Sequence, residues 1–181
     1  LQQILCGFVK TDDGIIENIQ GENPRVNELM DVIEETQGNI IIWATYRNSI
    51  KLIRDTLAKK YGANKVATYF GDTPSEERQN IVEKFQKGQI RFFIGQPRTG
   101  GYGLTLTNAK TVIYFNNTYD MEVRLQSEDR AHRIGQKDKV LYIDFVCPKT
   151  LDEKIIKTLN TKKKLADQIT GDNWKELFKE I

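Results

Sequence analysis

Short apolar runs alternate with helical patterns from residue 39 to residue 146, and this alternation restricts the fold more than any other feature of the chain. The run at 40–44 is continuous and rich in β-branched residues, which is typical of a strand buried on both faces. We therefore expect an α/β fold with a mostly parallel sheet, helices on both faces, and Trp43 in the core. Strands are expected at 40–44, 66–70, 90–94, 111–115 and 140–146, and helices around 50–57, 74–87, 121–133 and 151–165.

Two of the expected helix starts have the spacing of a capping box, in which a hydroxyl residue caps the helix and an acidic residue three positions later bonds back to it. They are Thr73-Pro74-Ser75-Glu76 and Thr150-Leu151-Asp152-Glu153. Pro74 also suits the first helical position, where no backbone N–H is needed. We expect Thr73 and Thr150 to be the N-cap residues.

The two ends of the chain depart from the alternating pattern. Asp13-Gly14 lies between two short apolar runs and predicts a hairpin turn. Asn23-Pro24 predicts the start of a short helix that ends near Gly38. The tail at 171–181 fits either a short amphipathic helix on a neighbour or a loosely docked terminus. We divide the chain into segments 1–24, 25–170 and 171–181.

Composition narrows the class of protein without naming a function. The 181 residues suit one compact domain, and 27 Lys plus Arg against 25 Asp plus Glu leave a net charge of +2. Such a small excess cannot identify a nucleic-acid binder, so any basic groove must come from local clustering. Two distant cysteines and one histidine predict neither a disulfide framework nor a structural metal. We expect no membrane span, and the missing first Met suggests a piece of a longer protein.

Two segments stand out as candidates for chemistry. The first, 98–106, has glycine at 100, 101 and 103, which lets a backbone approach a ligand closely or serves only as a turn. The second, 126–136, places Gln126, Arg130 and Arg133 along one face of the expected helix. Guanidinium forks match phosphate oxygens, so this face could hold a polyphosphate, or it could be a solvated face paired with nearby acids. We expect His132, between the arginines, to pack or bond within the domain.

The second segment, Gln126-Ser127-Glu128-Asp129-Arg130-Ala131-His132-Arg133-Ile134-Gly135-Gln136, closely resembles motif VI of Swi/Snf-type superfamily 2 ATPases. The glycine segment resembles their motif V, 40–43 resembles motif IV, and Gly71-Asp72-Thr73 with Arg78 and Phe85 resembles the motif that follows. The matches are in order and cover about residues 39–160. The resemblance implies a RecA-like lobe, that is, a P-loop NTPase fold without a P-loop. It makes 25–170 the second helicase lobe, 1–24 the connection between lobes, and 171–181 a tail.

The family's mechanism implies roles for these residues. Two lobes clamp ATP and Mg²⁺ between them, and the second lobe supplies arginine fingers, here Arg130 and Arg133, with Gln126 at the same interface. Gly101 and Gly103 are expected beside the nucleotide. The full-length protein would be a DNA-dependent ATPase that moves along duplex DNA, with the first lobe and DNA as its partners. It would work in the cytoplasm, or in the nucleus of a eukaryote.

Contacts to the DNA backbone should come from backbone N–H groups, hydroxyls and arginines, which carry no sequence information. The candidates are Arg47, Gly71, Thr73, Arg98, Thr99, Gly100, Gly101, Gly103 and Thr105. Some positions depart from the family pattern, which has Ser-Thr in place of Gln96-Pro97 and Asn in place of Thr105. Asn116 and Tyr119 likewise stand where Asp and Trp are usual.

The chain has no Gly-x-x-x-x-Gly-Lys-[Ser/Thr] loop and no Asp-Glu-x-His segment. We therefore expect this chain alone to be inactive as an ATPase. Two other functions remain open. One is a strand-separating DNA or RNA helicase built on the same lobe pair. The other is a non-catalytic domain that docks nucleic acid or partners, although a retired domain need not keep Gln126, Arg130 and Arg133.

Overall fold

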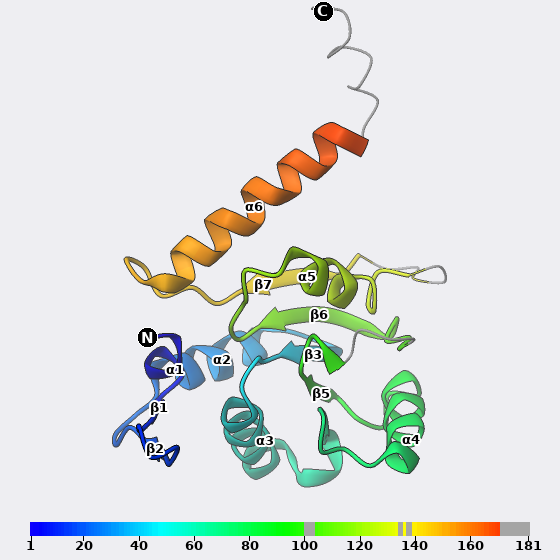
Figure 1. Ribbon diagram of the computed structural model, residues 1–181. Coiled ribbons are helices and arrows are strands. Elements are labelled where there is room, and N and C mark those ends of the chain that lie inside the picture. The colour runs from blue at the N-terminus through cyan, green and yellow to red at the C-terminus, as the bar shows by residue number, and fades with distance from the viewer. Residues whose placement is uncertain (100–103, 134–135, 137–138, 171–181) are drawn as a thin grey trace, which may run out of the picture.

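The computed structural model of the protein describes residues 1–99, 104–133, 136 and 139–170, with side chains described up to residue 166. Its centre is a five-stranded sheet in the order β4-β5-β3-β6-β7, in which every neighbouring pair is parallel (Figure 1). The strands are β3 Asn39–Trp43, β4 Val66–Tyr69, β5 Phe92–Gly95, β6 Ala109–Tyr114 and β7 Leu141–Asp144. The predicted parallel α/β sheet is confirmed.

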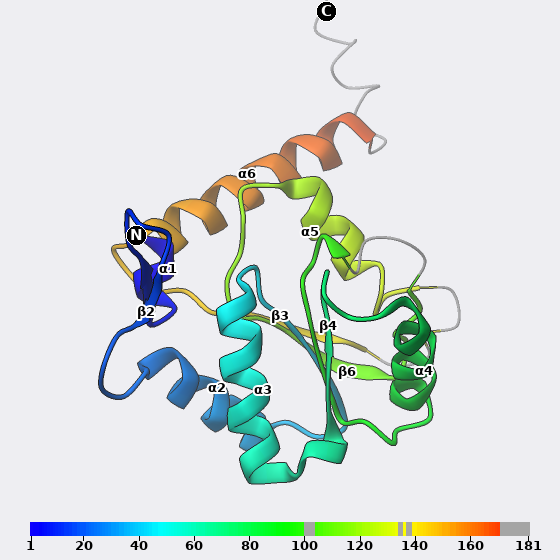
Figure 2. The ribbon, with the colours of Figure 1, turned by 60° about the horizontal axis from the view of Figure 1, so that its bottom comes forward.

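The central strand β3 has side chains buried on both faces of the sheet. Ile40 and Ile42 pack in one core cluster with residues of α2 (Pro24–Glu35) and α3 (Arg47–Tyr61). Ile41 and Trp43 face the other cluster, which includes Phe85 of α4 (Ser75–Gln86). This division follows from the pleat, which turns successive side chains to opposite faces. Trp43 is 0% exposed, as predicted, and helices cover both faces (Figure 2).

The remaining elements frame this core. A 3-10 turn, η1 Ala63–Lys65, precedes the edge strand β4, and α5 Met121–Glu128 connects β6 to the segment before β7. The last helix, α6 Leu151–Thr170, is anchored by buried Ile155 and Leu159 and then extends away from the sheet (Figure 1).

The first 24 residues form a hairpin and a short helix, α1 Gln2–Leu5. Strands β1 Phe8–Lys10 and β2 Ile16–Asn18 pair antiparallel around Gly14, whose φ of 82° suits a glycine turn, so the predicted hairpin is confirmed. Asn23 caps α2 by accepting hydrogen bonds from two backbone N–H groups, and Pro24 takes the first helical position. That helix start is also as predicted, and the helix ends at Glu35.

The two predicted capping boxes are wrong in detail. The hydroxyl of Thr73 accepts from the Phe70 N–H at 3.1 Å and donates to the Thr68 carbonyl at 3.3 Å. It closes the turn after β4 and is not free to cap α4, which starts at Ser75 with no side-chain cap. Thr150 does bond to the Asp152 N–H at 3.3 Å, but Glu153 reaches one residue further back, to the N–H of Lys149 at 3.0 Å.

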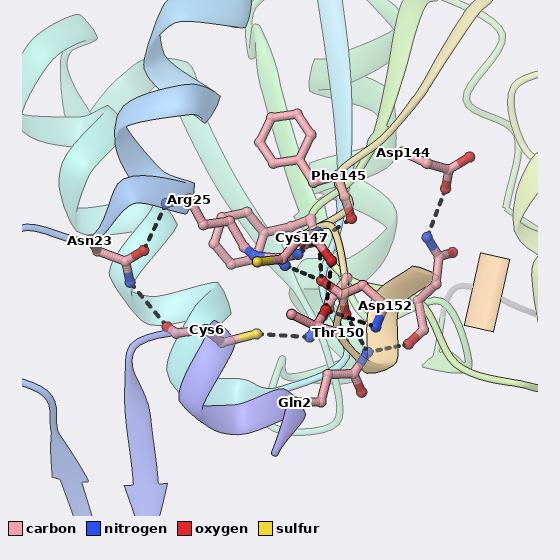
Figure 3. Close-up of polar contacts among 12 residues, drawn as sticks. Gln2, Cys6, Asn23, Arg25, Asp144, Phe145, Cys147, Thr150 and Asp152 are labelled. Atoms are coloured by element: carbon pink, nitrogen blue, oxygen red, sulfur yellow. Dashed lines mark hydrogen bonds and ion pairs between the residues drawn. The ribbon is translucent and has the colours of Figure 1, made fainter. Parts of the chain in front are cut away.

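A buried ion pair, Arg25 with Asp152, joins the start of the domain to α6 (Figure 3). The Arg25 guanidinium also donates to the carbonyls of Phe115 and Phe145, at the ends of β6 and β7. Asp152 in turn accepts from the backbone N–H of Cys147 at 3.3 Å and from Gln2 of α1 at 3.4 Å. Elements from both ends of the chain therefore meet at one edge of the sheet.

Candidate functional site

The helix that carries Gln126 ends before the two predicted finger arginines. α5 spans eight residues and stops at Glu128, so Arg130 and Arg133 lie in the turn that follows. The predicted helix at 121–133, with all three residues on one face, is therefore wrong beyond residue 128. The physical reason is tertiary bonding. The carbonyl of Arg130 accepts from the Leu106 N–H at 2.9 Å, and Ala131 is 0% exposed in the core cluster.

We call residues 129–133 the arginine turn. Both of its arginines reach the segment that follows the glycine loop in sequence. The Arg133 guanidinium donates to the hydroxyl of Thr105 at 3.1 Å, and that of Arg130 donates to the carbonyl of Leu104 at 3.5 Å. Arg133 is exposed and Arg130 is half-buried. The structure thus brings three predicted site residues together, Arg130, Arg133 and Thr105.

The other predicted members of this site are placed differently. The Gln126 amide donates to Glu122 one helical turn earlier, at 2.9 Å. His132 is exposed, so of the two alternatives expected for it, packing within the domain is wrong; its backbone N–H donates to the carbonyl of Glu128 at 3.0 Å. Gly100, Gly101 and Gly103 lie outside the described residues.

A second group of predicted residues lies at the carboxyl edge of the sheet. Arg47, at the start of α3, pairs with Asp72 at 3.0 Å, and Arg98 pairs with Asp120 at 2.9 Å. The side chains of Arg47 and Arg98 are 58% and 74% exposed. Gly71 sits beside Arg47, since a Cβ there would lie 3.4 Å from the guanidinium. Thr99 contacts Gln96, with 3.4 Å between side-chain oxygens.

Residues that depart from the family pattern hold this edge together. The Gln96 amide donates to the carbonyl of Thr45 at 2.8 Å, and the N–H of Thr45 donates to the Asn116 side chain at 2.8 Å. These two bonds connect the loops after β5, β3 and β6. Gln96 and Asn116 therefore have a structural role here, while Tyr119 is 43% exposed.

The two groups lie near opposite ends of the parallel strands. Asp120, which pairs with Arg98, caps the start of α5, and the arginine turn follows its end. Eight helical residues span about 12 Å at about 1.5 Å per residue. Thr105 and Leu104 come shortly before Ala109, where β6 begins. The arginine turn therefore lies toward the amino end of β6, away from Arg47 and Arg98.

Sequence reasoning missed Arg124, which fixes α5 against β6 and β7. Its guanidinium makes a double contact with Asp144, bonds to Glu128 at 2.6 Å and to Asn117 at 2.9 Å, and lies 3.6 Å from the ring centre of Tyr114. Burial lowers the pKa of Arg124, but hydrogen bonds and charge from Asp144 outweigh it, so that the net shift is upward. The i,i+4 spacing to Glu128 was the one signal available in the sequence.

Two tyrosines beside Arg124 complete this cluster. Burial raises the pKa of Tyr114, whose hydroxyl lies 2.7 Å from that of Ser127. Burial and the charge of Glu128 raise the pKa of Tyr142 to about 12. Both phenols therefore stay protonated near neutral pH.

The described residues show no sign of two other kinds of site. Among them there is no group of three or more His, Cys, Asp or Glu side chains placed to hold a metal ion. They also contain no helix long and apolar enough to cross a membrane.

Comparison with known proteins gives consistent results. The model of the helicase conserved C-terminal domain family matches residues 24–135. YwqA of Bacillus subtilis is 34% identical over 148 residues, which is 81% of this chain and 16% of that protein. The ISWI chromatin-remodeling complex ATPase CHR11 of Arabidopsis thaliana is 31% identical over 158 residues, which is 86% of this chain and 14% of that protein.

A solved structure supports the fold. The C-terminal part of the Fun30 ATPase domain superposes with a TM-score of 0.69 at 23% identity, covering 78% of this chain and 48% of the other. This chain spans only a small part of the length of its relatives, so their activities belong to larger molecules. The chain itself is a member of the helicase conserved C-terminal domain family, the C-terminal RecA-like lobe of a Swi/Snf-type ATPase.

Proposed function

We propose that this lobe supplies Arg130 and Arg133 as arginine fingers to ATP held mainly by a first lobe, in a protein that moves along duplex DNA. The observation that carries the proposal is the convergence of both guanidinium groups on Leu104 and Thr105. Arg133 is exposed there, and it bonds to a neutral hydroxyl rather than to a carboxylate. An anionic ligand can replace that hydroxyl at little cost, because a charge-assisted bond is the stronger one.

The residues present fit a polyphosphate. Bound ATP with Mg²⁺ would supply the γ-phosphoryl group and part of the charge that offsets it, and we propose no magnesium ligand among the described residues. Arg130 and Arg133 would donate to the phosphoryl oxygens as negative charge spreads over them, and the bonds that hold the turn would limit how far both side chains must move. Gly101 and Gly103 stay assigned to the nucleotide by resemblance, and Gln126 to the lobe interface.

The finger role is tested in the full-length protein by DNA-stimulated ATP hydrolysis. Arg133→Ala is expected to lower kcat by about 10³-fold or more. The matched control is Arg54→Ala, which removes an exposed arginine of α3 that pairs with its neighbour Asp55. Unchanged hydrolysis in Arg133→Ala would show that this residue is not a finger. The isolated chain is expected to show no hydrolysis with DNA, and robust turnover by it would overturn the assignment.

DNA contact is proposed at the carboxyl edge, through Arg47 and Arg98 with the backbone at Gly71 and Thr99, and Gly100 and Gly101 stay DNA candidates from the sequence alone. Exposed pairs such as Arg47–Asp72 and Arg98–Asp120 contribute at most about 1 kcal/mol, so a phosphate can replace either carboxylate. Thr73 supports DNA contact only by shaping the turn that it closes, because its hydroxyl already makes two hydrogen bonds within the lobe. Thr105 is shared with the arginine turn.

The DNA proposal is tested by duplex binding at several salt concentrations. Removing both arginines, in Arg47→Ala/Arg98→Ala, should flatten the slope of log affinity against log salt by about 2, since each phosphate contact contributes about 0.9. An unchanged slope would remove this edge from the DNA interface. Strand-displacement assays on the full-length protein then separate duplex translocation from unwinding.

A further inference from the structure

Gln136 closes the motif that contains both arginines, and its side chain has a specific set of contacts. Its amide nitrogen lies 2.8 Å from the carbonyl of Thr107, 3.4 Å from that of Ala109 and 3.2 Å from that of Ala131. The first two carbonyls belong to the start of β6, and the third belongs to the arginine turn. One side-chain amide therefore joins these two parts of the chain.

The start of β6 has a separate anchor on its other side. Gln86, at the end of α4, donates to the Thr107 hydroxyl at 3.0 Å and accepts from the Asn108 N–H at 3.0 Å. The Asn108 amide also donates to the carbonyl of Phe85 at 3.1 Å. What Gln136 adds to this arrangement is the connection to the arginine turn.

The turn is connected to this segment at two backbone positions. One is the carbonyl of Arg130, which accepts from the Leu106 N–H at 2.9 Å, and the other is the carbonyl of Ala131, which Gln136 holds. Two adjacent anchors restrict rotation of the turn about the first bond. Loss of the Gln136 side-chain bond removes one of these two backbone anchors, while the bond to Leu106 and the buried Ala131 keep the turn in place, so that mainly the direction of its side chains becomes less fixed.

We propose that Gln136 is a positioning residue for the reaction: it sets how the arginine turn is held against the 104–107 segment, and thereby where Arg130 and Arg133 point. This inference rests on the finger role proposed above. It assigns Gln136 no contact with ATP. A displacement of about 1 Å in a group that stabilises a transition state can cost about 10²-fold in rate, so a lost anchor acts on kcat more than on binding.

The test uses the full-length protein, with kcat and KM for ATP measured at saturating DNA and the melting temperature recorded for each variant. Gln136→Met keeps the size of the side chain and removes its N–H donors, and Gln136→Glu keeps the shape and removes the same donors. Both are expected to lower kcat by about 10- to 100-fold with little change in KM. Gln86→Met is the matched control, because it loosens the same strand start without touching the arginine turn.

The outcomes separate the two proposals. A folded Gln136 variant with the kcat of the unmodified protein overturns the positioning role, and so does an equal loss of kcat in Gln86→Met, which would indicate a general structural effect. If one Gln136 variant does not fold, the other decides. Arg133→Ala is measured alongside: if it leaves kcat unchanged, the finger role itself fails, whereas a large loss there with unchanged Gln136 variants rejects only the role of Gln136.

Discussion

Arg124 lies just before the 126–136 segment and Arg133 lies within it, and their surroundings are opposite. Arg124 is largely buried and contacts two carboxylates, an amide oxygen and an aromatic ring. Arg133 is exposed and donates to one hydroxyl. A guanidinium whose donors are taken up by fixed carboxylates holds helices and strands together. One that faces solvent with a neutral partner keeps its charge available for a ligand. We therefore expect substitution of Arg133 to impair ATP hydrolysis and substitution of Arg124 to lower stability.

The largest expected effect is on hydrolysis, from a change that keeps the charge of Arg133. In Arg133→Lys the full-length protein should lose at least about 10²-fold in kcat, because an ammonium lacks the planar fork that matches phosphoryl oxygens. Stability should stay within about 0.5 kcal/mol, as for most exposed positions. Steady-state kinetics and urea denaturation measure the two quantities. Normal hydrolysis by the lysine variant would mean that charge alone suffices.

The next effect is on stability, at Arg124. Arg124→Met should lower the free energy of unfolding by about 3 kcal/mol, because partly buried Asp144 loses its guanidinium partner and Glu128 keeps the longer pair with Lys163 at 3.8 Å. Urea denaturation of this chain, followed by circular dichroism, measures the change. Arg54→Met serves as the control, with an expected change within about 0.5 kcal/mol. Equal stability of the two variants would contradict the comparison.

A smaller loss of stability is expected at the other buried pair. Asp152→Asn keeps the shape of the side chain and removes the charge that faces Arg25. It should cost about 2–3 kcal/mol, less than Arg124→Met, because Arg25 keeps the carbonyls of Phe115 and Phe145 as acceptors. The same denaturation measurement applies. A loss larger than that of Arg124→Met would reverse the order of the two networks.

The smallest effect is on stability at alkaline pH. The folded pKa of Tyr142 is about 12, above its ordinary value near 10, so the folded protein keeps a proton that the unfolded chain loses first. Its contribution is complete below about pH 10 and is lost as pH rises from there toward about 12. Unfolding measured at pH 9 and at pH 11 should show a fall that is smaller in Tyr142→Phe. An identical fall in the variant would assign the effect to other groups.

Local signals in the sequence predicted the elements that depend on local physics. The apolar run at 40–44 became the central strand, and Asn23-Pro24 started α2, because burial and capping act over a few neighbouring residues. The order of the strands was not predicted, since it depends on which crossovers pack best. Thr73 had the right residue type for a cap, but its hydroxyl bonds to Thr68 and Phe70.

The residues of the candidate site follow from the motif, and their roles stay a prediction. The structure adds a contact that the sequence did not predict, the bond from Arg133 to the Thr105 hydroxyl. The helix was expected to continue to residue 133, but bonds from Leu106 and Gln136 take up the carbonyls of Arg130 and Ala131. Contacts between segments so far apart in sequence leave no trace in helical periodicity. Arg124 escaped notice for the same reason, because Asp144 is distant along the chain.

The pair formed by Arg25 and Asp152 also connects the first helices of this lobe to its last helix. Asp152, in the first turn of α6, pairs with Arg25 of α2 and accepts hydrogen bonds from Gln2 of α1 and from the Cys147 N–H (Figure 3). One carboxylate is therefore shared by α1, α2 and α6, so a change at Asp152 acts on three helices that lie far apart in the sequence.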